Sequence, residues 1–262
     1  MSQLSPTFPM TLSVDCGGGS IKSAVCASDG ALVTRPVVSP TNYPFHPEGL
    51  VGLIRNLIAH AGVPIDRLTV GVPGMIRAGK VIYTPHYTRV AGPHTEPSQS
   101  LLAAWDHLDL AQALQDATGL PARVINDSEL HGAALVTGHG LEVALTFGTG
   151  LGSSHFLGGV LQAHLEISHA PFQSGTTYDA YIGEHVRREL GDDAWSTRVL
   201  EVVGSLHPVL WWDALFIGGG NAHNLTASAL DALTAMGTDI TVVANHVALT
   251  GGAKVWSLTE SS

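Results

Sequence analysis

Basic residues are scarce in this sequence, and its apolar runs are short. Only 12 of the 262 residues are Lys or Arg, against 22 Asp and Glu, so the formal net charge is −10. Nucleic acids and anionic membrane surfaces bind clustered Lys and Arg side chains, and the sequence has no such cluster. No stretch reaches the roughly 18 apolar residues of a membrane span. The composition therefore argues against a nucleic acid or a membrane as the partner.

Cysteine is scarce too. Cys16 and Cys26 are too few for a disulfide framework, and no cysteine cluster has the spacing of a zinc site. Residues 1–10 contain neither the basic nor the long apolar segment of a signal peptide. We therefore expect a cytoplasmic protein without a zinc site, in which both cysteines are small buried side chains.

Apolar residues are abundant, at 45%, while charged residues make up 13%, which is typical of a globular protein. Apolar runs of strand length alternate with segments of helical spacing, which predicts an α/β fold. Strands are expected at 11–14, 21–27, 32–39, 68–72, 81–83 and 122–125, and helices at 49–61, 108–118, 177–190 and 193–206. Segment 84–100, "TPHYTRVAGPHTEPSQS", has no clear period and is predicted to be a mobile loop or lid.

Two segments share one pattern: "LSVDCGGGSIKSAVC" and "VALTFGTGLGSSHFL" each contain an apolar strand, a glycine turn and a second apolar strand. This internal similarity predicts two lobes of related topology, residues 1–125 and 126–262, with a ligand cleft between them. A helix is expected in "HVALTGGAKVWSL", with packing against the first lobe as one option. A third glycine cluster follows the strand in "LFIGGG".

Glycine turns of this kind suit phosphate groups, because without a Cβ the backbone N–H groups can approach an anion. A Walker A loop is absent, and a Rossmann turn would lead into a helix, whereas strands follow these turns. The alternative is a pair of tight hairpins in which turn geometry alone demands glycine. Asp15, just before the first turn, is a candidate for holding a hydrated Mg²⁺, and Lys22 is the only base nearby. Ordinary strand-end and surface roles remain open for both.

Asn126 and Asp127 stand between a predicted strand and a predicted helix in "VINDSELHGAA". Helix capping, helped by Glu129, is the favoured explanation when these residue types are taken alone. In a phosphate-binding protein, however, Asp127 is well placed to accept the proton of a substrate hydroxyl. Both interpretations stay open from the residues alone.

Glu166 and His169 lie three residues apart in "LEISHAPF". A carboxylate and an imidazole offer acceptors and a donor to the hydroxyls of a polyol. A metal site is disfavoured because no third ligand has suitable spacing.

Taken together, these motifs resemble the ROK family of sugar kinases, and within it the polyphosphate/ATP glucokinase branch. The resemblance rests on "DCGGGSIK", "VGVPGMI", "VINDSELHGAA", "LTFGTGLGS" and "WWDALFIGGGN", in the family's order from Leu12 onward. It implies an actin/hexokinase-like ATPase fold with ribonuclease H-like lobes. It also implies Mg²⁺-dependent transfer of a phosphoryl group from ATP or polyphosphate to the 6-hydroxyl of glucose or a related hexose, in a homodimer.

The resemblance assigns a role to each matching position. Asp127 would be the catalytic base, and the sugar would contact five residues, namely Asn126, Glu166, His169, Asp179 and Gly74. The phosphoryl donor would be held by residues of the three glycine segments: Asp15, Gly17, Gly18, Gly19, Ser20, Lys22, Gly148, Thr149, Gly150, Gly218, Gly219 and Gly220. Asp15 would contact Mg²⁺ through water.

This sequence also departs from the family pattern. Ser168 replaces the glycine of E-x-G-H, and Gly19-Ser20 inverts a Ser-Gly order. Residues 86–100 look inserted, and Asp179 replaces a glutamate. The alternatives are therefore a kinase for another sugar or amino sugar, a non-catalytic ROK-type sugar-binding protein, and an actin-like ATPase. The low positive charge favours ATP over the polyanion polyphosphate as the donor.

Overall fold

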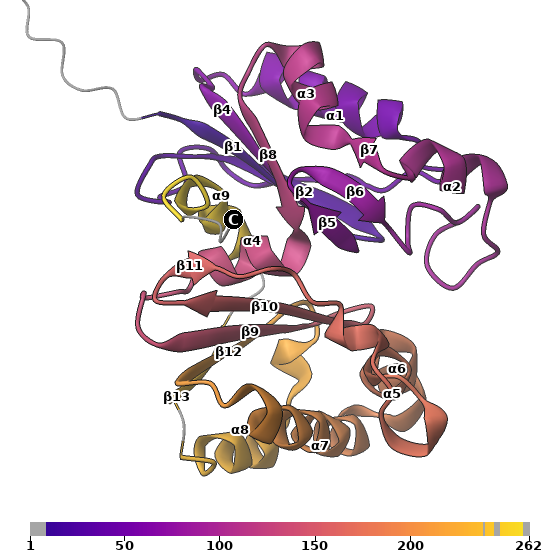
Figure 1. The fold of residues 1–262 in the computed structure, drawn as a ribbon, viewed down its shortest axis with the longest axis vertical. Helices are drawn as coiled ribbons and strands as arrows, with labels where there is room; N and C mark the ends of the chain where they lie inside the picture. The colour runs from indigo at the N-terminus through magenta and orange to yellow at the C-terminus, as the bar shows by residue number, and fades with distance from the viewer. Residues whose placement is uncertain (1–8, 238, 244–246, 259–262) are drawn as a thin grey trace, which may run out of the picture. The chain divides into compact units, whose positions relative to one another are not determined.

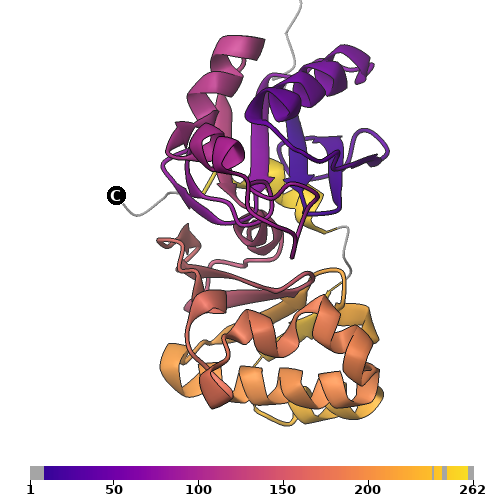
Figure 2. The same cartoon turned by 90° about the vertical axis from the view of Figure 1, so that its right-hand side faces the viewer.

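The computed structural model describes residues 9–237, 239–243 and 247–258 (Figures 1 and 2). The chain divides into two compact units. The first extends to Leu130 and includes Leu249–Ser257, and the second contains His131–Ala248 and Leu258. No helix among the described residues is long and apolar enough to cross a membrane.

The first unit is built on a five-stranded sheet with the order β3-β2-β1-β4-β8. β1, β4 and β8 are parallel to one another. β2 is antiparallel to β1, and β3 is antiparallel to β2. The strands are β1 Thr11–Cys16, β2 Ser20–Cys26, β3 Val37–Pro40, β4 Arg67–Val72 and β8 Ala122–Asn126. A smaller sheet holds β5 Met75–Arg77, β6 Lys80–Tyr83 and β7 Leu108–Asp109. The helices are α1 Pro47–His60, α2 Gln99–Trp105, α3 Leu110–Thr118, the start of α4 Asp127–Ala133, and α9 Ala248–Lys254.

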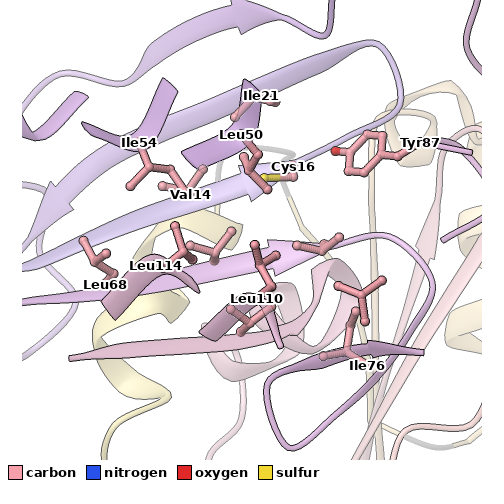
Figure 3. Close-up of a cluster of buried hydrophobic side chains, with 14 of the residues drawn as sticks. Val14, Cys16, Ile21, Leu50, Ile54, Leu68, Ile76, Tyr87, Leu110 and Leu114 are labelled. Carbon is pink, nitrogen blue, oxygen red and sulfur yellow. The ribbon is translucent and has the colours of Figure 1, made fainter. Parts of the chain in front are cut away.

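Side-chain alternation along β1 explains how the two faces of this sheet are covered. Leu12, Val14 and Cys16 are buried in the same core as the apolar side chains of α1 and α3 (Figure 3). On the other face, α9 approaches closely: Thr69 Oγ1 donates to the Gly252 carbonyl at 2.7 Å. A Cβ on Gly252 would lie 2.2 Å from Ser13 Oγ, so the helix requires glycine there.

The second unit contains a sheet with the order β11-β10-β9-β12-β13. Its strands are β9 Leu141–Phe147, β10 Leu151–Leu157, β11 Val160–Leu161, β12 Ala214–Gly218 and β13 Asp239–Val242. Its helices are the end of α4, α5 Tyr178–Ile182, α6 Glu184–Leu190, α7 Asp192–Leu210 and α8 Ala227–Thr234, with 3-10 turns at Ile167–His169, Gln173–Gly175 and Ala222–Asn224. Val143, Leu145 and Phe147 of β9 share a buried core with α7.

Three sequence expectations about elements need correction. The helix expected over 177–190 is two helices, α5 and α6, which meet at Gly183. The strand expected over 32–39 is confined to Val37–Pro40. The loop expected over 84–100 ends at Ser98, because α2 begins at Gln99, and Tyr87 within this loop is fully buried.

Candidate functional site

The first glycine turn, Gly17–Gly19, links β1 to β2, and its backbone is held from one side by other residues of the same unit. Thr41 Oγ1 and the Tyr87 hydroxyl donate to the Gly17 carbonyl at 3.0 and 3.2 Å. The Tyr43 hydroxyl donates to the Gly18 carbonyl at 2.8 Å. The Gly19 carbonyl accepts the N–H of Thr41 at 3.2 Å.

Unlike the carbonyls of this turn, its backbone N–H groups are not all hydrogen-bonded to protein groups. Gly17 N–H closes the hairpin on Ser20 O at 2.9 Å. Within the described ranges, no hydrogen bond takes the N–H of Gly18 or Gly19. Gly18 is buried and Gly19 is exposed, and a turn whose carbonyls are all satisfied while two consecutive amides have no protein partner is suited to an anion.

Tyr43 and Tyr87 were not identified from the sequence, because their role depends on tertiary contacts. Burial raises the pKa of Tyr43 to about 12 and raises the pKa of Tyr87 well above its usual range. Both phenols therefore stay protonated and donate at any physiological pH. In Figure 3 the Tyr87 hydroxyl points toward Cys16 at the end of β1.

Two carboxylates lie at the edge of the sheet that carries this turn. Asp15 of β1 is level with Gly71 of β4, and Gly71 is level with Ile125 of β8, so Asp127 follows at the same edge. Asp127 is close enough to Tyr87 that its charge contributes to the raised pKa of that phenol, as does the charge of Asp15. The structure thus brings together turn Gly17–Gly19, Asp15 and Asp127, and their roles toward a ligand stay predictions.

Asp15 is half-buried and lies opposite Lys22 in the register of the β1–β2 hairpin. Burial raises the pKa of its carboxyl, and the nearby charge of Lys22 opposes that rise. Among the described residues no group of three His, Cys, Asp or Glu side chains could hold a metal ion. Mg²⁺ is commonly held by one or two carboxylates together with water and phosphate oxygens, so a single carboxylate beside an anion turn fits this ion.

Asn126 and Asp127 show the capping role considered from the sequence, and the role of Asp127 as a base stays a prediction. The Glu129 carboxylate accepts the Asn126 N–H at 2.9 Å, which is the expected cap at the start of α4. Asn126 Oδ1 accepts the N–H and hydroxyl of Ser128, and Asn126 Nδ2 donates to Gly74 O at 2.8 Å. The side chain of Asn126 is therefore engaged with protein groups, and the half-buried Asp127 beside it accepts the Ser128 N–H through Oδ1 at 3.0 Å.

Gly74 is required by geometry. Its φ is +108°, and a Cβ there would lie 2.2 Å from Tyr83 O. The Asn126–Gly74 hydrogen bond joins two residues that the resemblance assigned to sugar binding. Their contact with a sugar stays a prediction.

The second glycine turn, Gly148–Gly150, repeats the design of the first in the second unit. Asn221 Nδ2 donates to Gly148 O at 3.1 Å, and Glu184 N donates to Thr149 O at 3.2 Å. Gly148 N donates to Gly150 O at 3.0 Å. Over the part of the chain that the structure describes, the amides of Thr149 and Gly150 have no partner. Two consecutive N–H groups are again available to an anion.

Asp179 and Glu184 support this second turn. Asp179 Oδ1 accepts the N–H of Leu151 at 2.6 Å, directly after the turn. Hydrogen bonding from Arg187 is the largest cause that lowers the pKa of Glu184 to about 2, and the Asn221 side chain also bonds to this carboxylate. The resemblance placed Asp179 at the sugar, whereas the structure shows it at the turn; sugar contact remains untested. Glu184 and Asn221 carried no sequence signal.

Close packing requires glycine at Gly218, the last residue of β12, and at Gly219, which follows it. A Cβ on Gly218 would lie 2.1 Å from His131 Nε2, and one on Gly219 would lie 2.4 Å from Phe147 O. The third glycine segment therefore packs against the strand that leads into the second turn. A role of Gly218–Gly220 beside a nucleotide base stays a prediction.

Glu166 precedes the first 3-10 turn of the second unit, Ile167–His169, and His169 is its last residue. The Glu166 carboxylate is half-buried and lies 3.3 Å from His164 Nε2, whereas His169 is exposed. Ser168 between them is buried. No sequence signal pointed to His164 or to His155 of β10. Besides burial, the nearby His164 contributes to the lowered pKa of His155.

His155 is buried, and neither ring nitrogen has a hydrogen-bond partner among the residues that the structure describes. Burial, followed by the nearby His164, lowers the pKa of His155 to about 4. His155 is therefore neutral at physiological pH.

A model of the ROK family matches residues 11–170. The N-acetylmannosamine kinase of Escherichia coli (strain SMS-3-5 / SECEC) is 29% identical over 157 residues, which are 58% of this chain and 48% of that protein. The chain thus spans about half the length of the curated relatives it matches.

Solved structures match almost the whole fold. An inorganic polyphosphate/ATP-glucomannokinase from Arthrobacter sp. strain KM superposes with a TM-score of 0.74 and 21% identity, over 95% of this chain and 98% of the other. A ROK family glucokinase from Streptomyces griseus, in complex with glucose and AMPPNP, gives 0.73 and 17%, over 94% and 98%. At these identities the likeness concerns the fold. The expected actin/hexokinase-like α/β fold is confirmed.

Proposed function

The chain belongs to the ROK family, and we propose that it is a sugar kinase, which transfers a phosphoryl group from ATP to the 6-hydroxyl of a hexose or an N-acetylated amino sugar. The observation that carries this proposal is the grouping in the first unit. There, two available amides of Gly18 and Gly19 share one sheet edge with the carboxylates of Asp15 and Asp127. An anion site beside a half-buried carboxylate suits phosphoryl transfer to a hydroxyl.

In this proposal Asp127 Oδ accepts the proton of the sugar hydroxyl as that oxygen attacks the terminal phosphorus. The proton moves to the carboxylate, the new O–P bond forms, and the bond to the leaving phosphate oxygen breaks. A positioned base contributes about 10²–10⁴-fold to the rate. Gly18, Gly19, Thr149 and Gly150 donate backbone N–H groups to donor phosphates, with Ser20 and Lys22 beside the first turn. Mg²⁺, held through water by Asp15, would neutralise phosphate charge.

For the acceptor, Glu166 and His169 would bind sugar hydroxyls. The name of the Escherichia coli relative supports N-acetylmannosamine as one acceptor, and the Streptomyces griseus complex supports glucose. The name of the Arthrobacter enzyme supports polyphosphate as a second donor. Against it stands the net charge of −10, which offers a long polyanion little attraction. A homodimer also remains a proposal.

A matrix of acceptors and donors tests this function. Purified protein with Mg²⁺ is assayed for sugar phosphate, with glucose, mannose, N-acetylmannosamine and N-acetylglucosamine each offered with ATP and with polyphosphate. We expect a product from ATP and at least one of these sugars. No product from any pair, with a sugar still bound in calorimetry, would make the chain a ROK-type binding protein instead.

A further inference from the structure

Three hydroxyl groups converge on the carbonyl side of turn Gly17–Gly19, and we name Thr41, Tyr43 and Tyr87 the hydroxyl clamp. They hold the Gly17 and Gly18 carbonyls at 2.8–3.2 Å, and none belongs to the hairpin that forms the turn. An isolated two-strand hairpin needs no such support, because its own Gly17 N–H closes on Ser20 O. The clamp therefore fixes the orientation of the peptide planes that carry the available amides.

Segment 84–98 supports the clamp. Tyr87 comes from this segment and packs against Phe45 and Trp105, with ring centroids 4.8 and 5.3 Å apart. Gly92 lies over the Tyr43 ring, since a Cβ on Gly92 would be 3.0 Å from that ring. Pro93 approaches Gly18 itself, within 2.8 Å of where a Cβ would stand.

Hydrogen bonds inside the segment keep it closed on itself. Arg89 donates to Thr95 O at 2.7 Å and to Pro85 O at 3.3 Å, and Ser98 N donates to Thr88 O at 2.8 Å. These bonds make the segment a compact loop that packs on the clamp residues.

We propose that Thr41, Tyr43 and Tyr87 are positioning residues that preset the Gly18 and Gly19 amides for the donor phosphates, and that segment 84–98 holds them in place. This inference rests on the proposed function, because it assigns the phosphoryl donor to turn Gly17–Gly19. Each peptide plane has its carbonyl tied on one side, so its N–H points to the other. Loosening one carbonyl lets that plane rotate and weakens donor binding, while the sugar contacts are untouched.

The test removes hydroxyl groups one at a time. Tyr43→Phe deletes the only donor to Gly18 O among the described residues and should weaken affinity for Mg·AMPPNP about three- to tenfold. Tyr87→Phe alone should cost about twofold, because Thr41 still holds the Gly17 carbonyl. Thr41→Val combined with Tyr87→Phe should exceed the product of the two single effects.

Matched controls delete hydroxyl groups elsewhere. Thr118→Val removes a 2.7 Å bond to Leu114 O in the same unit, and Tyr181→Phe removes a bond to Glu201 in the other. Both should leave donor affinity unchanged, whatever they do to stability. Affinity for Mg·AMPPNP and for tripolyphosphate is measured by calorimetry without sugar, beside KM for donor and for sugar and the thermal midpoint.

The outcomes separate the inference from the proposed function. Weaker binding of the phosphate probe by the clamp variants, with KM for sugar unchanged, supports the inference even if no sugar is phosphorylated. Equal probe binding by wild type and clamp variants overturns it, even if the protein is a sugar kinase. A wild-type protein that binds neither probe overturns both.

Discussion

Gly18 and Gly19 are neighbours in one turn, yet their surroundings differ. A Cβ on Gly18 would lie 2.8 Å from Pro93 Cγ and 3.4 Å from the His86 ring, whereas one on Gly19 would meet nothing within 4 Å. Gly18 is therefore required by the segment that packs on the turn. Gly19 is the open position of the turn, where a ligand can approach.

This difference predicts the stability of two variants. Gly18→Ala should lower the free energy of unfolding by about 1–3 kcal/mol, because the added methyl group forces Pro93 or the turn to move. Gly19→Ala should stay within about 0.5 kcal/mol of wild type, as surface substitutions usually do. Urea unfolding of both variants measures this, and equal losses would show that Pro93 does not confine Gly18.

Asp127 is the residue on which the chemistry depends. In Asp127→Asn the amide oxygen can still accept the Ser128 N–H, which Asp127 Oδ1 accepts at 3.0 Å, so the start of α4 should persist. We expect kcat to fall by about 10²–10⁴, because the amide cannot take a proton, with affinities for sugar and nucleotide nearly unchanged. Turnover near the wild-type rate would remove Asp127 as the base.

At single residues, the sequence indicates where chemistry lies better than which atoms meet. Glycine turns, Asp15 and Asp127 have local signatures, because turn geometry and strand ends restrict residue type. The hydrogen-bond partners of Asn126 were not predictable, because its side-chain amide donates to the carbonyl of Gly74, which is far away in sequence. Tyr43, Tyr87 and His164 likewise act through contacts that no periodicity reveals.

Among the elements, β10 carries a pH-sensitive residue. The pKa of His155 falls from 6.5 to about 4 because burial penalises its charged form. Between these pH values the unfolded chain binds a proton that the folded chain does not. The contribution of His155 is therefore complete above pH 6.5 and is lost as pH falls toward 4.

This linkage predicts a measurable difference. Wild type should lose roughly 2 kcal/mol more unfolding free energy than His155→Gln between pH 7.5 and pH 5. His60→Gln, a change at an exposed histidine of α1, serves as the control and should follow wild type. Urea unfolding at both pH values measures the effect. Parallel losses in wild type and His155→Gln would show that His155 is protonated as easily when folded.

Element boundaries were predictable where local pattern decides them. The helices expected over 49–61 and 108–118 correspond to α1, Pro47–His60, and α3, Leu110–Thr118. Segment 84–98 was not predictable, because its order comes from Tyr87 in a distant core and from backbone bonds that no composition signals. The break between α5 and α6 has a similar origin, since a Cβ on Gly183 would lie 2.7 Å from Thr149 O.

For the whole chain, the repeated strand–turn–strand pattern predicted two units of related topology. Each unit has a five-stranded sheet, and each sheet contains a hairpin that ends in a glycine turn. The position of the boundary, at Leu130 within α4, and the return of Leu249–Ser257 to the first unit depend on tertiary packing. The small residues of "LTGGAK" are the local sequence feature that permits this packing, because Gly252 lies against Ser13.

A sugar kinase transfers the phosphoryl group to a sugar rather than to water. The most direct test is ³¹P NMR of the protein with Mg·ATP, without sugar and then with glucose or N-acetylmannosamine. We predict a sugar phosphate ester signal that appears with ADP only when sugar is present, and that is absent in Asp127→Asn. Inorganic phosphate formed at the same rate with or without sugar would instead identify the protein as an ATPase.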